Sequence, residues 1–246
     1  MSPQNKPTPK PSFLSVAENW LLPIMLVISL MSSGLINGCS KTRVEEPVAP
    51  GRSTSFTEEF KDVYKATQTE GWISINNTGP DFTGSWIQGH DASMDKVGGI
   101  YGFPAFSYTT TVDEFIYASS MYTSNRTNIS SWLLTPVLSV KNGDKISFYT
   151  RADAASGCND RMQVLMNGGQ TDVGKSPTST GSFSKVILDI NSSQAVNAYP
   201  TAWTKYEYIF SGISGNVNAR IAFRYYVPST VPGKGIGIDL FKFEVL

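Results

Sequence analysis

The feature that most constrains this chain is a stretch near its middle, in which apolar and polar side chains alternate over residues 130–140 and again over residues 145–151. Both segments are rich in Trp, Val, Ile, Phe and Tyr, which suit a pleated and half-buried surface. Asn142 and Gly143 lie between them, and this pair readily adopts the positive φ of a tight turn. The stretch therefore predicts two β-strands around a turn.

Alternation of the same kind continues to the C-terminus. In residues 203–210 and 221–227 apolar side chains take every second position, so one face of each strand is expected to be buried. The last segment, residues 236–246, changes parity between Leu240 and Phe241. Such a change indicates a β-bulge or a strand that is buried on both faces.

The spacing of these segments predicts nine or ten short strands without intervening helices. Residues 56–64 alone fit either an edge strand or a short helix. The 21 glycines and 14 prolines suit many tight turns, and no internal repeat indicates a propeller or a solenoid. We therefore predict one all-β domain, a jelly-roll β-sandwich, over residues 56–246. The predicted core contains Trp132, Leu134, Ile146, Phe148, Phe223 and Ile238.

The N-terminal segment is typical of an export signal. Lys6 and Lys10 precede an apolar run, residues 20–36, that ends in small residues before Cys39. The Ile-Asn-Gly-Cys at its end resembles the lipobox of bacterial lipoproteins, whose Cys carries the lipid. An uncleaved membrane anchor is the alternative, but the run is at the short limit of about 17 to 25 residues for spanning. We predict a signal peptide over residues 1–38.

Residues 39–55 have little to bury and contain two prolines and a glycine, so they are expected to form a flexible tether that begins at the lipidated Cys39. This layout predicts a lipoprotein of the bacterial cell envelope. The lipid would hold the domain to the outer membrane.

The composition argues against several function classes. The 20 basic and 20 acidic residues cancel, and no basic run is interleaved with aromatics, so we expect no nucleic-acid partner. His90 is the only histidine and no Cys-x-x-Cys pair occurs, so a zinc site or a His-activated nucleophile lacks its residues. No compact acidic motif brings together the carboxylate pair of a glycoside hydrolase. We predict that the chain is not an enzyme, and that Cys39 and Cys158 form no disulfide.

Eight short segments from about Trp72 onward resemble, in order, the choice-of-anchor J domain, a relative of the cleaved adhesin domains of bacterial haemagglutinins. The resemblance implies a secreted jelly roll held to the cell surface by varying anchors, here the lipid. It also implies adhesin relatives that are linked to calcium, glycans or host proteins. The segments are Trp86–Gly89, Phe103–Ala105, Trp132–Pro136, Asp160–Val164, Leu188–Asn191, Tyr199–Pro200 with Trp203–Thr204, Ala222–Tyr225 and Ile236–Asp239.

Exposed aromatic side chains in loops are the candidate ligand-binding residues, because binding residues collect in loops and aromatic faces stack on sugar rings. Tyr101 and Tyr122 lie in or beside the long loops, whereas Trp86 and Phe103 are expected in the core. We predict a non-catalytic module that binds extracellular carbohydrate. A protein-binding adhesin or a structural component of the cell envelope is the alternative.

Two carboxylates are candidate metal ligands. Glu59 and Asp239 would meet if the two ends of the domain are adjacent, and a hard cation such as calcium takes six to eight oxygens. The residues themselves indicate no cofactor. Calcium is suggested only by the resemblance to adhesin domains. The preferred alternative is an ion pair of Asp239 with Arg224, expected if the last two strands form a hairpin and contributing about 0.2 to 1 kcal/mol.

Overall fold

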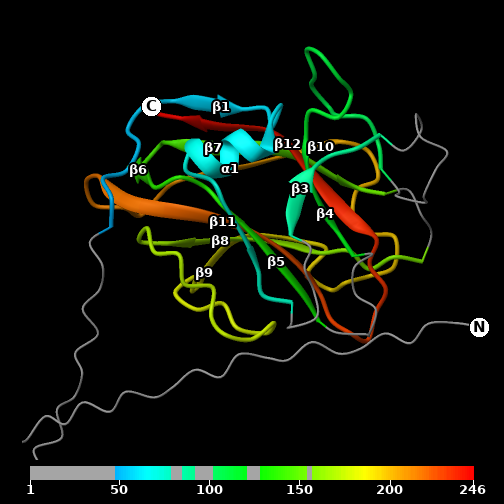
Figure 1. Cartoon of the computed structure of the whole chain (residues 1–246). Helices are drawn as coiled ribbons and strands as arrows, with labels where there is room; N and C mark the ends of the chain where they lie inside the picture. Colours follow the sequence, from blue (N-terminus) through cyan, green and yellow to red (C-terminus); the bar gives the residue numbers. More distant parts are fainter. Residues whose placement is uncertain (1–47, 79–84, 92–101, 121–127, 154–156) are drawn as a thin grey trace, which may run out of the picture. The chain divides into compact units, whose positions relative to one another are not determined.

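Two six-stranded antiparallel sheets form the framework of the domain (Figure 1). The structure is a computed structural model that describes residues 48–78, 85–91, 102–120, 128–153 and 157–246. Its strands are β1 (Phe56–Glu58), β2 (Ile73–Asn76), β3 (Trp86–Gln88), β4 (Ile116–Ser119), β5 (Ile129–Leu134), β6 (Leu138–Val140), β7 (Lys145–Ala152), β8 (Met162–Asn167), β9 (Lys185–Ile190), β10 (Thr204–Ile209), β11 (Val217–Val227) and β12 (Gly235–Glu244).

Strands that follow one another in the chain mostly lie in different sheets, but β3 and β4, β5 and β6, and β8 and β9 share a sheet. The first sheet has the order β10-β7-β12-β4-β3, with β1 also pairing with β12, and the second has the order β2-β5-β11-β8-β9, with β6 also pairing with β11. The runs β4-β12-β7-β10 and β5-β11-β8-β9 are the two four-stranded halves of a jelly roll. The predicted all-β jelly-roll β-sandwich is therefore confirmed.

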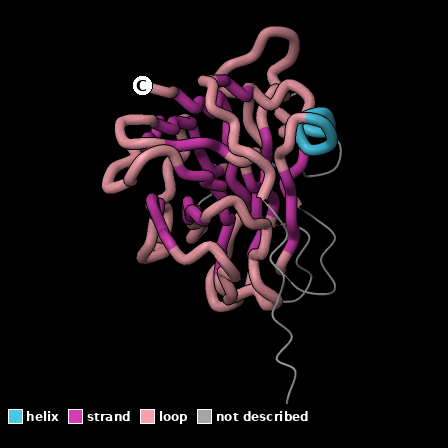
Figure 2. Tube along the Cα trace, turned by 90° about the vertical axis from the view of Figure 1, so that its left-hand side faces the viewer, coloured by secondary structure: helices cyan, strands magenta, loops and turns pink. Residues whose placement is uncertain are grey.

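A short helix, α1 (Val63–Thr69), lies at the periphery of the strands, which bears out in part the helix that the sequence left open for residues 56–64 (Figure 2). Asp62 caps it by accepting a 2.8 Å hydrogen bond from the N–H of Lys65. Val63 and Ala66, three positions apart, are its buried residues. Segment 56–64, ambiguous in sequence, thus contains both a short strand and the start of a helix.

The turn at Asn142 and Gly143 joins strands of different sheets. Strand β6 pairs with β11 in the second sheet, whereas β7 pairs with β10 and β12 in the first. Gly143 has a φ of 93°, as the turn requires. Residues 145–151 form one strand as predicted, but residues 130–140 form two, β5 and β6, and β6 does not pair with β7.

The predicted hairpin of the last two strands is wrong, because β11 belongs to the second sheet and β12 to the first. The ion pair of Arg224 with Asp239 is therefore wrong as well. Arg224 instead donates to Ser130 Oγ at 3.1 Å, to Gln163 Oε1 at 3.0 Å and to the carbonyl of Pro177. Burial lowers the pKa of Arg224 to about 10.

The main core lies between the sheets and is built around aromatic rings. Phe223 meets Phe148 edge-on at 4.9 Å between ring centroids and Phe241 at 6.0 Å. Trp132 also is buried, but on the outer face of the second sheet, where Phe183 covers it at 5.6 Å. All six predicted core residues are fully buried: Trp132, Leu134, Ile146, Phe148, Phe223 and Ile238.

A bulge interrupts β12, as the change of parity indicated. The register with β7 shifts between Asp239 and Lys242, and Leu240 has a φ of 48°. The shift places Phe241 and Phe243 in the core. It also leaves Asp239 facing the outer side of the first sheet, away from Ile238 and the core.

The last residues of the predicted tether contact the domain. Arg52 donates its backbone N–H to the carbonyl of Val137 at 2.8 Å and accepts from the N–H of Ser139 at 2.9 Å. Within the described ranges, no helix is both long and apolar enough to cross a membrane.

Candidate binding site

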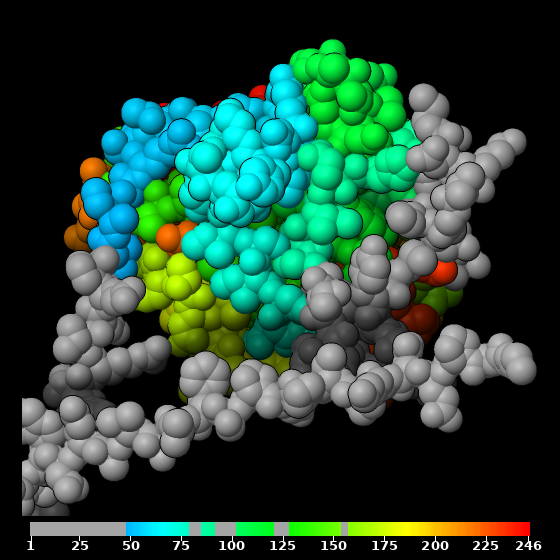
Figure 3. Space-filling model, viewed as in Figure 1, coloured from blue at the N-terminus to red at the C-terminus, as the bar shows by residue number. Residues whose placement is uncertain are grey.

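A loop, residues 102–115, folds over the outer face of the first sheet and projects at the top of the molecule, in green (Figures 1 and 3). Phe103 packs against Phe115 and Trp203, at 5.1 and 5.4 Å between ring centroids. Trp203 Nε1 also donates to the carbonyl of Pro104 at 2.9 Å. Phe103 is only 4% exposed, so its predicted burial is confirmed. This small second core fixes the base of the loop.

The tip of the loop is held by one carboxylate. Glu114 accepts hydrogen bonds from the backbone N–H groups of Thr109, Thr110 and Thr111 at 2.7, 2.7 and 3.0 Å. Although burial acts to raise it, these donors hold the pKa of Glu114 down to about 2. The carboxylate therefore stays ionised across the physiological pH range and keeps the loop in one conformation.

A second carboxylate ties the loop to the sheet. Asp239 Oδ2 accepts from the N–H groups of Phe106 and Ser107 at 2.8 and 2.9 Å, and its Oδ1 accepts from the N–H of Leu240 at 2.6 Å. The side chain is fully buried. Burial raises the pKa of Asp239 to about 7, although the three N–H donors favour the carboxylate. Asp239 thus determines where Phe106 lies.

The loop presents aromatic rings to solvent. The Phe106 ring stacks on the Tyr149 ring, with the centroids 3.7 Å apart and the planes 15° apart, yet Phe106 remains 42% exposed. Tyr108, two residues further along, is 54% exposed. We call Phe106, Tyr108 and Tyr149 the aromatic surface. Because its loop is fixed by Asp239 and Glu114, a ligand stacking there would order few additional groups.

The residues predicted to bind ligand were not those of the aromatic surface. Tyr101 and Tyr122, and the lipidation residue Cys39, lie outside the described residues. Phe106 and Tyr108 were missed, although they follow the same rule of aromatics in a long loop. In the sequence, three threonines stand shortly before Glu114, and this spacing could have indicated that Glu114 folds back to fix the tip of the loop.

The two predicted metal ligands lie near each other. The Glu59 carboxylate contributes to the raised pKa of Asp239, after burial. However, Glu59 pairs with Lys61 at 3.1 Å, and both Asp239 oxygens already accept N–H groups. In the part of the chain that the structure describes, no three His, Cys, Asp or Glu side chains gather as metal ligands would.

No family model and no curated protein matches the chain in sequence. Among solved structures it is similar to the K1 cleaved adhesin domain of Lys-gingipain from Porphyromonas gingivalis, with 16% identity over 79% of this chain and 99% of that one and a TM-score of 0.49. It is also similar to the CBM22-1 xylan-binding domain from Paenibacillus barcinonensis, with 14% identity over 80% and 97% and a TM-score of 0.36. Likenesses of this size do not carry the function of those proteins over to this chain.

Proposed function

We propose that this chain is a non-catalytic binding module of the bacterial cell envelope and that its ligand is an extracellular carbohydrate. The observation that carries the proposal is the aromatic surface: Phe106 is supported from below by Tyr149 and remains open to solvent, beside the exposed Tyr108. Sugar rings present C–H faces that pack on such rings. The surface is pre-organised by Asp239 and Glu114, as a recognition site needs.

Attachment to the membrane through lipid on Cys39 is part of the same proposal. The lipobox-like Ile-Asn-Gly-Cys supports it, and the resemblance to the choice-of-anchor J domain supports attachment at the cell surface. A lipid anchor would hold the domain outside the cytoplasm, where it would meet glycans rather than nucleic acid. The balanced charges give no attraction to a polyanion.

Screening the purified protein on a glycan array, with and without calcium, tests the ligand class. We expect saturable binding to at least one glycan, lost in Phe106→Ala and retained in Tyr64→Ala. Tyr64 is the matched control because it is 77% exposed on α1, away from the aromatic surface. Glycan binding that requires calcium would support the predicted metal site at Glu59 and Asp239.

A pull-down from cell-surface extracts, run in parallel, tests the alternative. The same exposed rings suit the centre of a protein interface, where aromatics are enriched. Protein partners that are lost in Phe106→Ala, together with an empty array, would replace the carbohydrate proposal with a protein-binding adhesin.

A further inference from the structure

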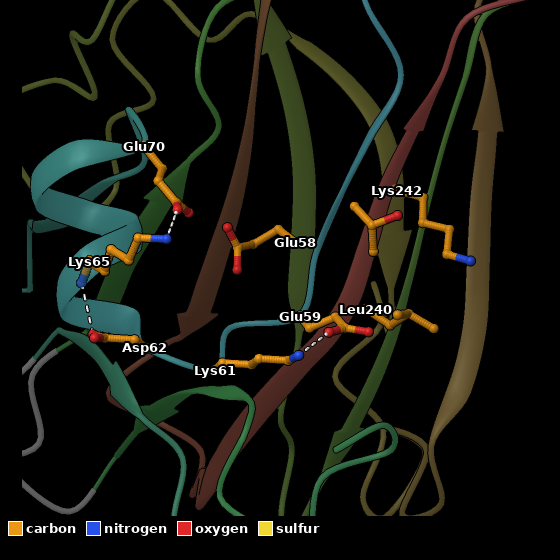
Figure 4. Close-up of a pocket in the computed structure, with 9 residues that line it drawn as sticks. Glu58, Glu59, Lys61, Asp62, Lys65, Glu70, Leu240 and Lys242 are labelled. Carbon is orange, nitrogen blue, oxygen red and sulfur yellow. Dashed lines mark hydrogen bonds and ion pairs between the residues drawn. The ribbon is translucent and has the colours of Figure 1, made fainter. Parts of the chain in front are cut away.

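A pocket of about 520 Å³ lies where helix α1, the end of β1 and the bulge of β12 meet (Figure 4). Its volume is within the range of about 300 to 1,000 Å³ that is usual for small-molecule sites. Its lining is polar apart from one leucine. The lining residues are Thr57, Glu58, Glu59, Lys61, Asp62, Lys65, Glu70, Leu240 and Lys242.

Most of the charged groups in the pocket are arranged as neighbouring acid and base. Lys65 Nζ lies 2.7 Å from Glu70 Oε1, and Lys61 Nζ lies 3.1 Å from Glu59 Oε2 (Figure 4). Each pair offers N–H donors beside carboxylate acceptors. Such alternation matches hydroxyl groups, which both donate and accept, better than it matches a ligand with a single strong charge.

Glu58 decides the net charge of the pocket. Its carboxyl group faces Glu70 across the pocket, and burial, followed by the interaction with Glu70, raises its pKa to about 7 (Figure 4). Lys65 and the N–H of Phe60 act in the opposite direction. With Glu58 protonated, the three remaining carboxylates are balanced by three lysines, so the pocket is neutral.

Two bulky residues with positive φ lie in the pocket wall or next to it in the chain. Phe60 has a φ of 51° and follows Glu59 directly, and Leu240, with a φ of 48°, is part of the wall. Neither side chain favours this backbone conformation, which is found most often at functional sites. Glu58 and Glu59 are adjacent at the end of β1, and their side chains point to opposite sides of it, as successive residues of an extended segment do (Figure 4).

Asp239 joins the pocket to the aromatic surface. One of its oxygens accepts from the N–H of Leu240, in the pocket wall, and the other accepts from the N–H of Phe106. The two features are therefore held by opposite sides of one carboxylate.

We propose that the pocket is a second carbohydrate-binding site, which takes a single neutral sugar residue through its hydroxyl groups. This inference rests on the proposed function but uses different residues. It specifies an uncharged sugar as the ligand and the edge formed by α1 and β12 as its location.

Amide chemical shifts measured by NMR on the ¹⁵N-labelled protein test both sites at once. The probes are glucose, glucosamine, maltohexaose, cellohexaose and laminarihexaose. We expect at least one neutral probe to shift the amides of Thr57, Lys61 and Lys65 in a saturable way, because none of these donates to Asp239. Shifts at Ser107 and Tyr108 report separately on the aromatic surface.

The outcomes separate the two proposals. Shifts at Ser107 and Tyr108 alone would overturn the second site and keep the proposed function. Shifts at the pocket amides alone would keep the second site and carbohydrate binding, and would overturn the aromatic surface as the place where the ligand binds. A response in neither place would overturn both. Pocket shifts with glucosamine but with none of the neutral probes would show a cation site and contradict the inference.

Substitutions give a matched comparison. Glu70→Gln breaks the pair with Lys65 and is expected to weaken binding at the pocket amides about tenfold, as the loss of one charge-assisted hydrogen bond implies. Glu244→Gln breaks an exposed pair with Lys145 at 3.1 Å outside the pocket lining and should leave binding unchanged. Equal weakening in the two variants would contradict the proposal.

The pH dependence of probe binding tests whether Glu58 contacts the ligand, because a purely structural role of Glu58 would not make binding depend on its protonation. Raising the pH from 6 to 8 ionises Glu58, which removes a donor and gives the pocket a net negative charge, so binding of the neutral probe should weaken. Asp239, which accepts from the N–H of Leu240 in the pocket wall, titrates over the same range, so the comparison is made in an Asp239→Asn background. In that background Glu58→Gln keeps a donor at both pH values and should bind equally at each. A wild type without this pH dependence would contradict the role given to Glu58.

Discussion

Asp239 on β12 accepts a 2.8 Å hydrogen bond from the backbone N–H of Phe106, a residue 133 positions earlier in the chain. The bond places the exposed Phe106 ring directly on Tyr149. A fully buried carboxylate in the framework therefore positions an aromatic side chain at the surface. The framework and the proposed binding site are linked through this one group.

The buried Asp239 should make stability depend on pH. Its pKa in the folded protein, about 7, exceeds the value of about 3.9 for an unfolded aspartate. The native state then binds the extra proton between these values, so the free energy of unfolding should fall as pH rises from about 4 to about 7, by at most about 1.4 kcal/mol per pH unit. Glu58 acts in the same direction.

Urea denaturation at pH 5, 6, 7 and 8 measures this dependence. Asp239→Asn removes one titrating group and should reduce the slope of unfolding free energy against pH below 7. Asp172→Asn, at an exposed position in the loop 168–184, is the control and should leave the slope unchanged. An identical slope in the wild type and in Asp239→Asn would show that this carboxyl group titrates normally.

Arg224 and Asp239 should not couple. They belong to different sheets, and each faces the outer side of its own sheet. In a double-mutant cycle of Arg224→Gln and Asp239→Asn, we expect the changes in unfolding free energy to add within about 0.5 kcal/mol. A larger interaction energy would restore the hairpin that the sequence suggested.

The wrong hairpin shows that the sequence predicted the faces of the strands but not their pairing. Alternation identified the inward face of β11 and the bulge of β12, because side-chain periodicity is a local property. Strand pairing is not a local property. Strands β11 and β12 are consecutive in the chain but belong to different sheets, so the prediction that Arg224 lies opposite Asp239 was wrong. The same limit applies to the turn at Asn142 and Gly143.

The sequence predicted the type of residue in the candidate site, but not which residues form it. Aromatics in a long loop were expected to bind ligand, and Phe106 and Tyr108 fit that description. Their exposure depends on Glu114 folding back onto three backbone N–H groups and on Asp239 reaching the loop from the last strand. The second contact spans most of the chain, and no pattern in one segment encodes it.

Truncating Phe223 should strongly destabilise the fold, because this side chain is fully buried between Phe148 and Phe241. We expect Phe223→Ala to lower the free energy of unfolding by about 3 to 5 kcal/mol, because it leaves a cavity between the sheets. Ile209→Ala, at a position 56% exposed on β10, should change it by less than about 0.5 kcal/mol. Similar losses in the two variants, measured by urea denaturation, would be inconsistent with the packing described.

Lipid attachment is tested by metabolic labelling with a fatty-acid analogue in a bacterial host. The wild type should be labelled and Cys39→Ala should not, because the thiol of Cys39 is the predicted attachment point. Cys158→Ala is the matched control and should label like the wild type. Equal labelling of all three proteins would exclude Cys39 as the lipid-bearing residue.

Isothermal titration of the glycan with the strongest array signal tests the central claim most directly. The titration compares the wild type with Phe106→Ala and with the exposed aromatic control Tyr64→Ala, after thermal unfolding has shown equal stability. We expect Phe106→Ala to weaken affinity at least about tenfold, as for a central aromatic contact, and Tyr64→Ala to bind like the wild type. Equal affinity in all three proteins would contradict carbohydrate recognition by the aromatic surface.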